Sequence, residues 1–279
     1  MNIKSCQDKP VGIFDSGVGG LTIANAVRNQ LPGEQIIYFG DTFHLPYGDK
    51  SRESVQYYST RITDFLLDFD CKVILIACNT ASASAYEEVT RHVGKRAVVF
   101  NVIDPVVKYV TRNYDGGKIG IIGTKGTINS GTYQMKLKEI IPSLDVAAVA
   151  TPLLVPMIEE GFIFDDISNA IIRTYLSNPL LEDVNTLILG CTHYPIIKRQ
   201  IEKFFNFESD VIDSGHIVAS SVKDYLESNG LLRTGRKPEH KFFISDYTEY
   251  FEKISRMFFE ESISLEERNI WRTNLSSKN

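Results

Sequence analysis

The chain has 279 residues, of which 43% are hydrophobic and 23% are charged, an ordinary balance for a soluble globular protein with one large domain or two modest ones. Its formal net charge of −5 argues against a nucleic-acid partner, because nonspecific nucleic-acid binding normally needs a basic surface. The polar amino terminus lacks the apolar core of a signal peptide, and the most apolar long stretch, VAAVATPLLVPMI, is too short for a membrane span. We therefore expect a cytoplasmic protein without a membrane partner.

Short apolar runs alternate with amphipathic helical patterns along nearly the whole chain. The runs are rich in Val and Ile and almost continuous, as is typical of strands covered on both faces of a parallel sheet. They occupy residues 11–14, 36–39, 73–77, 97–103, 118–123, 146–150, 186–190 and 210–214. The alternation predicts an α/β protein with largely parallel sheets flanked by helices, and ligand sites beyond the carboxyl ends of the strands.

Residues 51–70 show the clearest helical pattern, with Ser51 as the expected amino-terminal cap. Six apolar side chains form its buried stripe: Val55, Tyr58, Ile62, Phe65, Leu66 and Phe69. After residue 213 the pattern predicts a helix, a strand in HKFFISD and a final helix, a tail that could return to the first part of the fold.

The sequence also shows a loose internal duplication. The strand and turn at Asp15 have a counterpart at Thr124, and the segment at Cys78 has a counterpart at Cys191, each about 110 residues further along the chain. Matched order and spacing of this kind predict two similar lobes.

Two of the four cysteines share one sequence context. Cys78 ends VILIAC and Cys191 ends TLILGC, so each follows a strand-like run and opens a segment expected to be helical. Unpaired N–H groups at a helix amino terminus favour a thiolate, so the pattern indicates a pair of sulfur acid/bases. A single cysteine in this context is an inert buried side chain about as often as it is functional, but a second cysteine at the matching position favours a functional pair. Cys6 and Cys71 lack this context and are expected to be structural or incidental.

Polar residues surround both cysteines. Asn79 and Thr80 follow the first, in a run of small residues that lets a substrate approach the helix end. Thr192 and His193 follow the second, and His193 is placed to tune the Cys191 thiolate or to act as an acid/base. Cys-x-His is too short for a zinc site, and no C-x-x-C pair occurs, so we expect no metal.

Two loops are further candidates. Asp15 and Ser16 open a glycine-rich turn that suits a charged group but lacks the spacing of a dinucleotide site, and a plain strand-to-helix turn is the alternative. Tyr47 and Gly48 lie in the loop after the second strand, where the alternative is a proline-containing turn with a solvated aspartate. His44 in that loop is expected to be exposed and is given no role.

An acidic pair, Glu159 and Glu160, stands before a glycine in PLLVPMIEEG. Adjacent carboxylates at a helix end are usually solvated, although one of these could approach the site from the second lobe. Helical direction alone does not choose between them.

Five boxes occur in the order DSGVGGLT, GDT-x-x-x-PYG-x-KS, ACNTASA, LVPMIEEG and LGCTHYP. Together they resemble the cofactor-independent glutamate racemases over nearly the whole chain, from about residue 11 to residue 246. The resemblance implies two similar α/β lobes with the active site in the cleft between them. It places residues 1–100 and 213–279 in the first lobe and residues 101–212 in the second. Phe43 and His44 depart from the family, which commonly has a small residue and an arginine there, and NVIDP departs from its usual acidic version.

The same resemblance implies roles for individual residues. Cys78 and Cys191 correspond to the two catalytic acid/bases, Asp15 and His193 to their respective helpers, and Glu159 to the acidic partner of His193. The implied substrate contacts are Asp15, Ser16, Tyr47, Gly48, Asn79, Thr80, Thr192 and His193.

The implied reaction is the interconversion of L- and D-glutamate, supplying D-glutamate for peptidoglycan. A thiolate on one face of the substrate removes the α-proton and a thiol on the other face delivers one. No pyridoxal lysine motif is apparent, so we expect no cofactor. Glutamate is then the small-molecule partner, and assembly into a homodimer stays open. A racemase of another acidic amino acid, such as aspartate, and a non-catalytic metabolite-binding protein of the same fold are the alternatives; a cysteine hydrolase would leave the Cys78 box unexplained.

Overall fold

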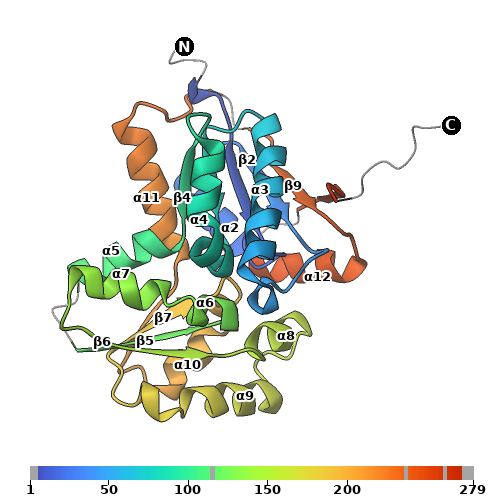
Figure 1. The fold of residues 1–279 in the computed structure, drawn as a ribbon. Helices are drawn as coiled ribbons and strands as arrows, with labels where there is room; N and C mark the ends of the chain where they lie inside the picture. The colour runs from blue at the N-terminus through green and yellow to red at the C-terminus, as the bar shows by residue number, and fades with distance from the viewer. Residues whose placement is uncertain (1–5, 114–116, 236–237, 260–262, 272–279) are drawn as a thin grey trace.

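The computed structural model describes residues 6–113, 117–235, 238–259 and 263–271, which form two parallel β-sheets with helices packed around them (Figure 1). The larger sheet has six strands in the order β10-β9-β2-β1-β3-β4. Every neighbouring pair in it is parallel. Its strands are β1 (Val11–Asp15), β2 (Ile36–Gly40), β3 (Val73–Ile76), β4 (Val98–Asn101), β9 (Lys241–Ile244) and β10 (Leu265–Glu267).

The smaller sheet has four strands in the order β6-β5-β7-β8, again all parallel. Its strands are β5 (Lys118–Gly123), β6 (Asp145–Ala150), β7 (Thr186–Gly190) and β8 (Asp210–Ile212). The prediction of an α/β protein with parallel sheets is thus confirmed.

Helices cover the sheets and connect their strands (Figure 1). Around the larger sheet lie α2 (Leu21–Gln30), η1 (Tyr47–Asp49), α3 (Arg52–Asp68), α4 (Asn79–Val93), α11 (Gly215–Ser228) and α12 (Glu249–Phe258). The other helices are α5 (Ile103–Asn113), α6 (Lys125–Asn129), α7 (Thr132–Ile140), α8 (Leu154–Glu159), α9 (Asp166–Leu176), η2 (Pro179–Leu181), η3 (Tyr194–Ile197) and α10 (Lys198–Phe204).

The two sheets repeat one strand order. The run β2-β1-β3-β4 of the larger sheet places second, first, third and fourth strands side by side, and β6-β5-β7-β8 does the same in the smaller sheet. The predicted duplication is therefore present in the topology. Its consequence is that Cys78 and Cys191 follow equivalent strands, β3 and β7.

The apolar runs fold as strands because both of their faces are covered. All five residues of β1 and all four of β3 are buried, and so are all five of β7. The helix predicted at residues 51–70 is α3, and the Ser51 hydroxyl accepts a hydrogen bond from Ser54 N at 3.2 Å, as expected of its cap. These buried runs and capped helices give the site a rigid frame.

The run at residues 97–103 was predicted to be one strand, but its last part is helical. The Asn101 side chain accepts hydrogen bonds from Ile103 N and Asp104 N, both at 2.9 Å, and so ends β4 and begins α5. Competition from a short amide side chain for backbone N–H groups is the physical reason for the error.

The carboxyl-terminal tail does return to the first sheet, because β9 pairs with β2. The same segment adds β10 beyond β9, a strand that the sequence did not predict. Apart from Asn101 at the end of β4, the strands of the two sheets fall into the chain segments expected for two lobes, while the division at residues 100 and 212 stays a prediction.

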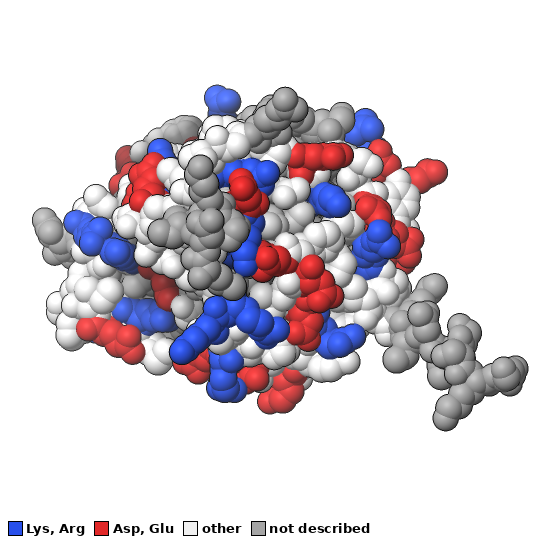
Figure 2. All heavy atoms as spheres, turned by 90° about the horizontal axis from the view of Figure 1, so that it is seen from above, with Lys and Arg blue, Asp and Glu red and all other residues white. Residues whose placement is uncertain are grey.

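Lysine and arginine are interspersed with aspartate and glutamate on the face shown in Figure 2, which is the view from above Figure 1. In the part of the chain that the structure describes, no helix has the length and apolar character needed to cross a membrane.

Candidate active site

A cavity of about 320 Å³, including the open space at its mouth, lies beyond the carboxyl ends of strands from both sheets. The larger-sheet side contributes Cys78, Asn79 and Thr80, and the smaller-sheet side contributes Cys191, Thr192 and His193. Ser16, Tyr47 and Gly48 complete the set of predicted residues that line it. The structure therefore brings the two cysteine boxes to one cavity, as two facing lobes would require.

Asp15 and Glu159 lie outside this lining and contact residues within it. Asp15 is completely buried, and its carboxylate accepts hydrogen bonds from Gly17 N at 3.0 Å and from the Thr192 hydroxyl at 3.4 Å. Glu159 Oε1 lies 3.0 Å from His193 Nε2. Of the acidic pair that helical direction could not resolve, Glu159 is the member that reaches the site.

Cys78 caps the amino terminus of α4. Its sulfur accepts a hydrogen bond from Ala81 N at 3.5 Å and lies 3.7 Å from the Ser16 hydroxyl. At this residue burial and the charge of Asp15 oppose the effect of the helix end. Burial, followed by the charge of Asp15, raises the pKa of Cys78 to about 12, and these hydrogen bonds offset the rise only in part.

Cys191 is not at the start of an α-helix. A turn follows it, then the short η3 and only then α10, so helical N–H groups do not cap this sulfur as they cap Cys78. Its neighbour is His193, whose Nδ1 lies 3.8 Å from the sulfur. Burial lowers the pKa of His193, but hydrogen bonds to Cys191 and Glu159 outweigh it and hold the pKa well above its ordinary value. A protonated imidazole beside a sulfur favours the thiolate.

The protonation of Cys78 can be probed with an alkylating agent. We expect iodoacetamide to modify Cys78 only slowly at pH 7, because only the thiolate is the nucleophile and burial raises the pKa of this thiol. A thiol with a pKa near 12 gains about tenfold in thiolate for each pH unit, so modification of Cys78 should rise steeply from pH 7 to pH 9. Mass spectrometry of the Cys78 peptide measures the rate at each pH, and a rate that does not change between pH 7 and pH 9 would contradict the assignment.

Glycines allow the two lobes to approach closely. A Cβ atom on Gly19 would lie 2.4 Å from the His193 ring, and one on Gly48 would lie 2.6 Å from Thr124 Cβ. Any side chain at these positions would push the lobes apart at the cavity.

Two hydroxyl-bearing residues of the site were not predicted, and neither were the lining residues Pro46, Val155 and Gly190. Thr124 lines the cavity, and its hydroxyl lies 2.8 Å from that of Thr80. Thr124 is the counterpart of Asp15 in the internal duplication, and this correspondence could have identified it as a site residue from the sequence. Tyr133 donates a hydrogen bond to Asn79 Oδ1 at 2.8 Å, and nothing in its sequence context indicates this contact.

Apart from the His193 ring, the donors facing the cavity are neutral. Asn79 is 2% exposed; its Oδ1 accepts the hydrogen bond from Tyr133, and its Nδ2 has no hydrogen-bond partner among the described residues. No described lysine or arginine belongs to the lining, so an anionic ligand would rely on this amide, on hydroxyls and on the amino terminus of α4. Within the described ranges, no cluster of three or more His, Cys, Asp or Glu side chains is arranged to hold a metal ion.

The chain matches known proteins over most of its length. Residues 21–222 match the model of the Asp/Glu/Hydantoin racemase family. The glutamate racemase of Geobacter metallireducens is 41% identical over 251 residues, covering 90% of this chain and 92% of that protein. The glutamate racemase of Aquifex aeolicus is 39% identical over 253 residues, covering 91% and 95%.

Solved structures give the same result. The crystal structure of glutamate racemase from Francisella tularensis in complex with D-glutamate superimposes with a TM-score of 0.89 at 37% identity, covering 95% of this chain and 99% of that one. The resemblance found in the five sequence boxes is thus confirmed. The chain belongs to the Asp/Glu/Hydantoin racemase family.

Proposed function

We propose that the protein is a glutamate racemase that interconverts L- and D-glutamate with two cysteines as acid/bases. The observation that carries the proposal is the position of Cys78 and Cys191, which follow equivalent strands of two sheets and line one cavity. The names of its relatives, and the D-glutamate in the Francisella complex, support glutamate as the substrate. Supply of D-glutamate for peptidoglycan, in the cytoplasm, is the role we attach to this activity.

Substrate binding would use the neutral donors of the cavity. Asn79 Nδ2, the hydroxyls of Ser16, Thr80 and Thr192, and the first N–H groups of α4 suit the two carboxylates of glutamate. Burying a carboxylate among fixed donors replaces its hydration without a free counter-charge.

The proton transfers follow from the unequal sulfurs. In one direction the Cys191 thiolate removes the α-proton from one face, and the electron pair left on Cα takes a proton from the Cys78 thiol on the other face. The two sulfurs end with exchanged protonation states, so the opposite enantiomer meets the complementary form and runs the steps in reverse. His193, held by Glu159, stabilises the Cys191 thiolate, and Asp15 favours the protonated form of Cys78.

One incubation tests the function. The protein is dialysed against chelator, no pyridoxal phosphate is added, and L-glutamate is supplied in deuterated water. We expect optical activity to decay to zero while one deuterium enters at Cα of the product. L-Aspartate is incubated in parallel, and racemisation of aspartate instead of glutamate would favour the alternative racemase. If neither substrate exchanges its α-proton or racemises, a non-catalytic binding protein would be favoured. Strict dependence on metal or pyridoxal phosphate would refute the cofactor-free mechanism, and assembly into a homodimer stays a prediction.

Tyr133→Phe should weaken substrate binding without touching the cavity directly. The substitution removes the hydrogen bond that fixes Asn79, so the amide can turn its Nδ2 away from the substrate. We expect KM for L-glutamate to rise about threefold to tenfold, the effect of about 1 kcal/mol for one neutral hydrogen bond, with kcat changed less. Tyr109→Phe, at an exposed tyrosine of α5, is the matched control. Unchanged KM in Tyr133→Phe would show that Asn79 needs no such support.

A further inference from the structure

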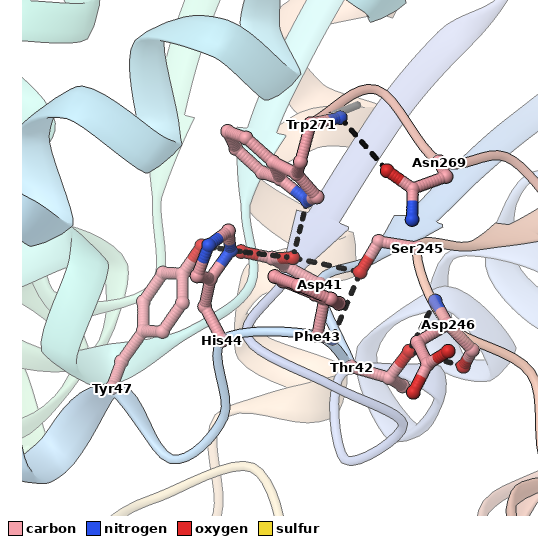
Figure 3. Close-up of polar contacts among 9 residues, drawn as sticks. All are labelled: Asp41, Thr42, Phe43, His44, Tyr47, Ser245, Asp246, Asn269 and Trp271. Atoms are coloured by element: carbon pink, nitrogen blue, oxygen red, sulfur yellow. Dashed lines mark hydrogen bonds and ion pairs between the residues drawn. The ribbon is translucent and has the colours of Figure 1, made fainter. Parts of the chain in front are cut away.

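The residue after β2, Asp41, is a buried junction of three chain segments, its own loop, the end of β9 and the segment at Trp271, and is not the solvated aspartate of the alternative interpretation of this loop. Its side chain is completely inaccessible to solvent. Oδ1 accepts hydrogen bonds from the Ser245 hydroxyl at 2.7 Å and from Trp271 Nε1 at 2.9 Å, while Oδ2 accepts one from the Tyr47 hydroxyl at 2.7 Å (Figure 3). A buried carboxylate with this many donors is held in one geometry.

His44 also belongs to this junction, so the expectation that it is exposed is wrong. Its Nδ1 lies 2.9 Å from Asp41 Oδ2. The ring stacks on Tyr58 with centroids 4.0 Å apart and meets the edge of Trp271 at 4.5 Å. His44 therefore makes an aromatic contact between the loop and Trp271.

Further hydrogen bonds join the loop to the end of β9. Phe43 N donates to the Ser245 hydroxyl at 2.9 Å. The Thr42 hydroxyl donates to Asp246 O at 2.6 Å and accepts from Asp246 N at 2.9 Å (Figure 3). The carboxyl-terminal tail thus holds the first half of the loop along its length.

The second half of the same loop lines the active-site cavity. Tyr47 and Gly48 both face it, and Gly48 lies against Thr124 of the other lobe. The hydroxyl of Tyr47 points to Asp41, where burial and the carboxylate charge raise its pKa well above the usual value and keep it a donor. The turn that faces the substrate is therefore fixed between Asp41 on one side and Thr124 on the other.

We propose that Trp271 is a positioning residue for the substrate loop: with Ser245 it holds the Asp41 carboxylate, and through Asp41 it holds the Tyr47–Gly48 turn against the cavity. The inference deepens the proposed glutamate racemase function and rests on it. Trp271 is not one of the residues that line the cavity; it acts through one carboxylate oxygen of Asp41, 230 residues away in sequence. Loss of its N–H would leave Asp41 short of a donor and let the turn shift, which costs substrate contacts.

Trp271→Phe tests this because it removes the N–H and keeps an aromatic ring against His44. We expect KM for L-glutamate to rise roughly fivefold to tenfold with kcat within about twofold of wild type, the pattern of lost binding that is uniform between ground and transition states. Ser245→Ala removes the other donor to the same oxygen and should give the same split. Tyr247→Phe, which removes a hydrogen bond to Glu252 outside the junction, is the control and should leave both constants unchanged.

Trp271 is the single tryptophan of the chain, so its fluorescence reports on the junction in Ser245→Ala, and a changed emission maximum is expected there. Wild-type KM in Trp271→Phe would overturn the inference. So would a fall in melting temperature and kcat with KM unchanged, since that pattern belongs to a merely structural tryptophan. If the unmodified protein does not racemise glutamate at all, the proposed function fails instead, and the two failures are told apart by that measurement.

Discussion

Cys78→Ala and Cys191→Ala will each abolish the racemisation of glutamate, with a loss of about 10⁴-fold or more, the upper range for removal of a positioned acid/base. Inversion at Cα needs a proton acceptor on one face and a donor on the other, and each variant keeps only one of them. Both sulfurs lie at the cavity, and neither takes part in a disulfide, so alanine should leave the fold intact.

The same variants should separate the two faces of the substrate. With one sulfur left, slow exchange of the α-proton in deuterated water is expected for one enantiomer only, with retention of configuration, and for opposite enantiomers in the two variants. Nuclear magnetic resonance of the α-position measures this exchange. Cys71→Ala, at a buried cysteine away from the cavity, is the matched control and should racemise normally. Near-wild-type racemisation in either active-site variant would refute the two-base mechanism.

His193→Asn and Asp15→Asn will change the two directions of the reaction in opposite senses. In the proposed mechanism His193 supports the Cys191 thiolate and Asp15 supports the Cys78 thiol, so each variant disturbs a different sulfur. We expect kcat to fall by about 10² to 10⁴-fold in the more affected direction. Glu159→Gln, which removes the charge that holds His193, should act in the same sense as His193→Asn but more weakly.

The equilibrium constant of a racemisation is one, and this places a condition on the result. For every variant, kcat/KM must be equal in the two directions, so the asymmetry can appear only in kcat and KM taken separately. Circular dichroism progress curves started from each enantiomer give all four constants. A ratio of the two kcat values that moves in the same sense in His193→Asn and Asp15→Asn would contradict the assignment of one helper to each sulfur.

Local patterns predicted most of the frame. Apolar runs form strands where both faces of the strand are buried. Ser51 caps α3 as predicted, because an amino-terminal cap depends only on neighbours within one helical turn. The matched spacing of the cysteine boxes placed them on equivalent strands, since strand order follows the duplication. Each of these features depends on residues close in sequence or on a repeated unit.

The features that sequence could not provide are long-range or electrostatic. Asp41 meets Ser245 and Trp271 across 204 and 230 residues, a pairing that exists only after the tail returns to the first sheet. Burial raises the pKa of Cys78 and local hydrogen bonds lower it, and the prediction from the helix end considered only the hydrogen bonds. Cys191 needed the actual turn geometry to show that histidine, rather than a helix, is its partner.

The repeated strand order has a consequence for handedness. Two lobes of L-residues can be related only by a rotation, whereas the two enantiomers of the substrate are related by a mirror plane. The rotation between the lobes and the reflection between the enantiomers can both reverse one common direction, which is the line between the two sulfurs. In the proposed mechanism inversion takes place along this line: the three heavy substituents of Cα stay bound in their subsites, and the hydrogen leaves from one side and is replaced from the other. One asymmetric set of subsites then binds both enantiomers. For this reason only the two sulfurs need to occupy equivalent positions. The residues that follow them can differ, and they do: Asn79 and Thr80 follow Cys78, whereas Thr192 and His193 follow Cys191. A compound that is planar at this carbon should bind equally well to the two forms of the enzyme, the one that acts on L-glutamate and the one that acts on D-glutamate.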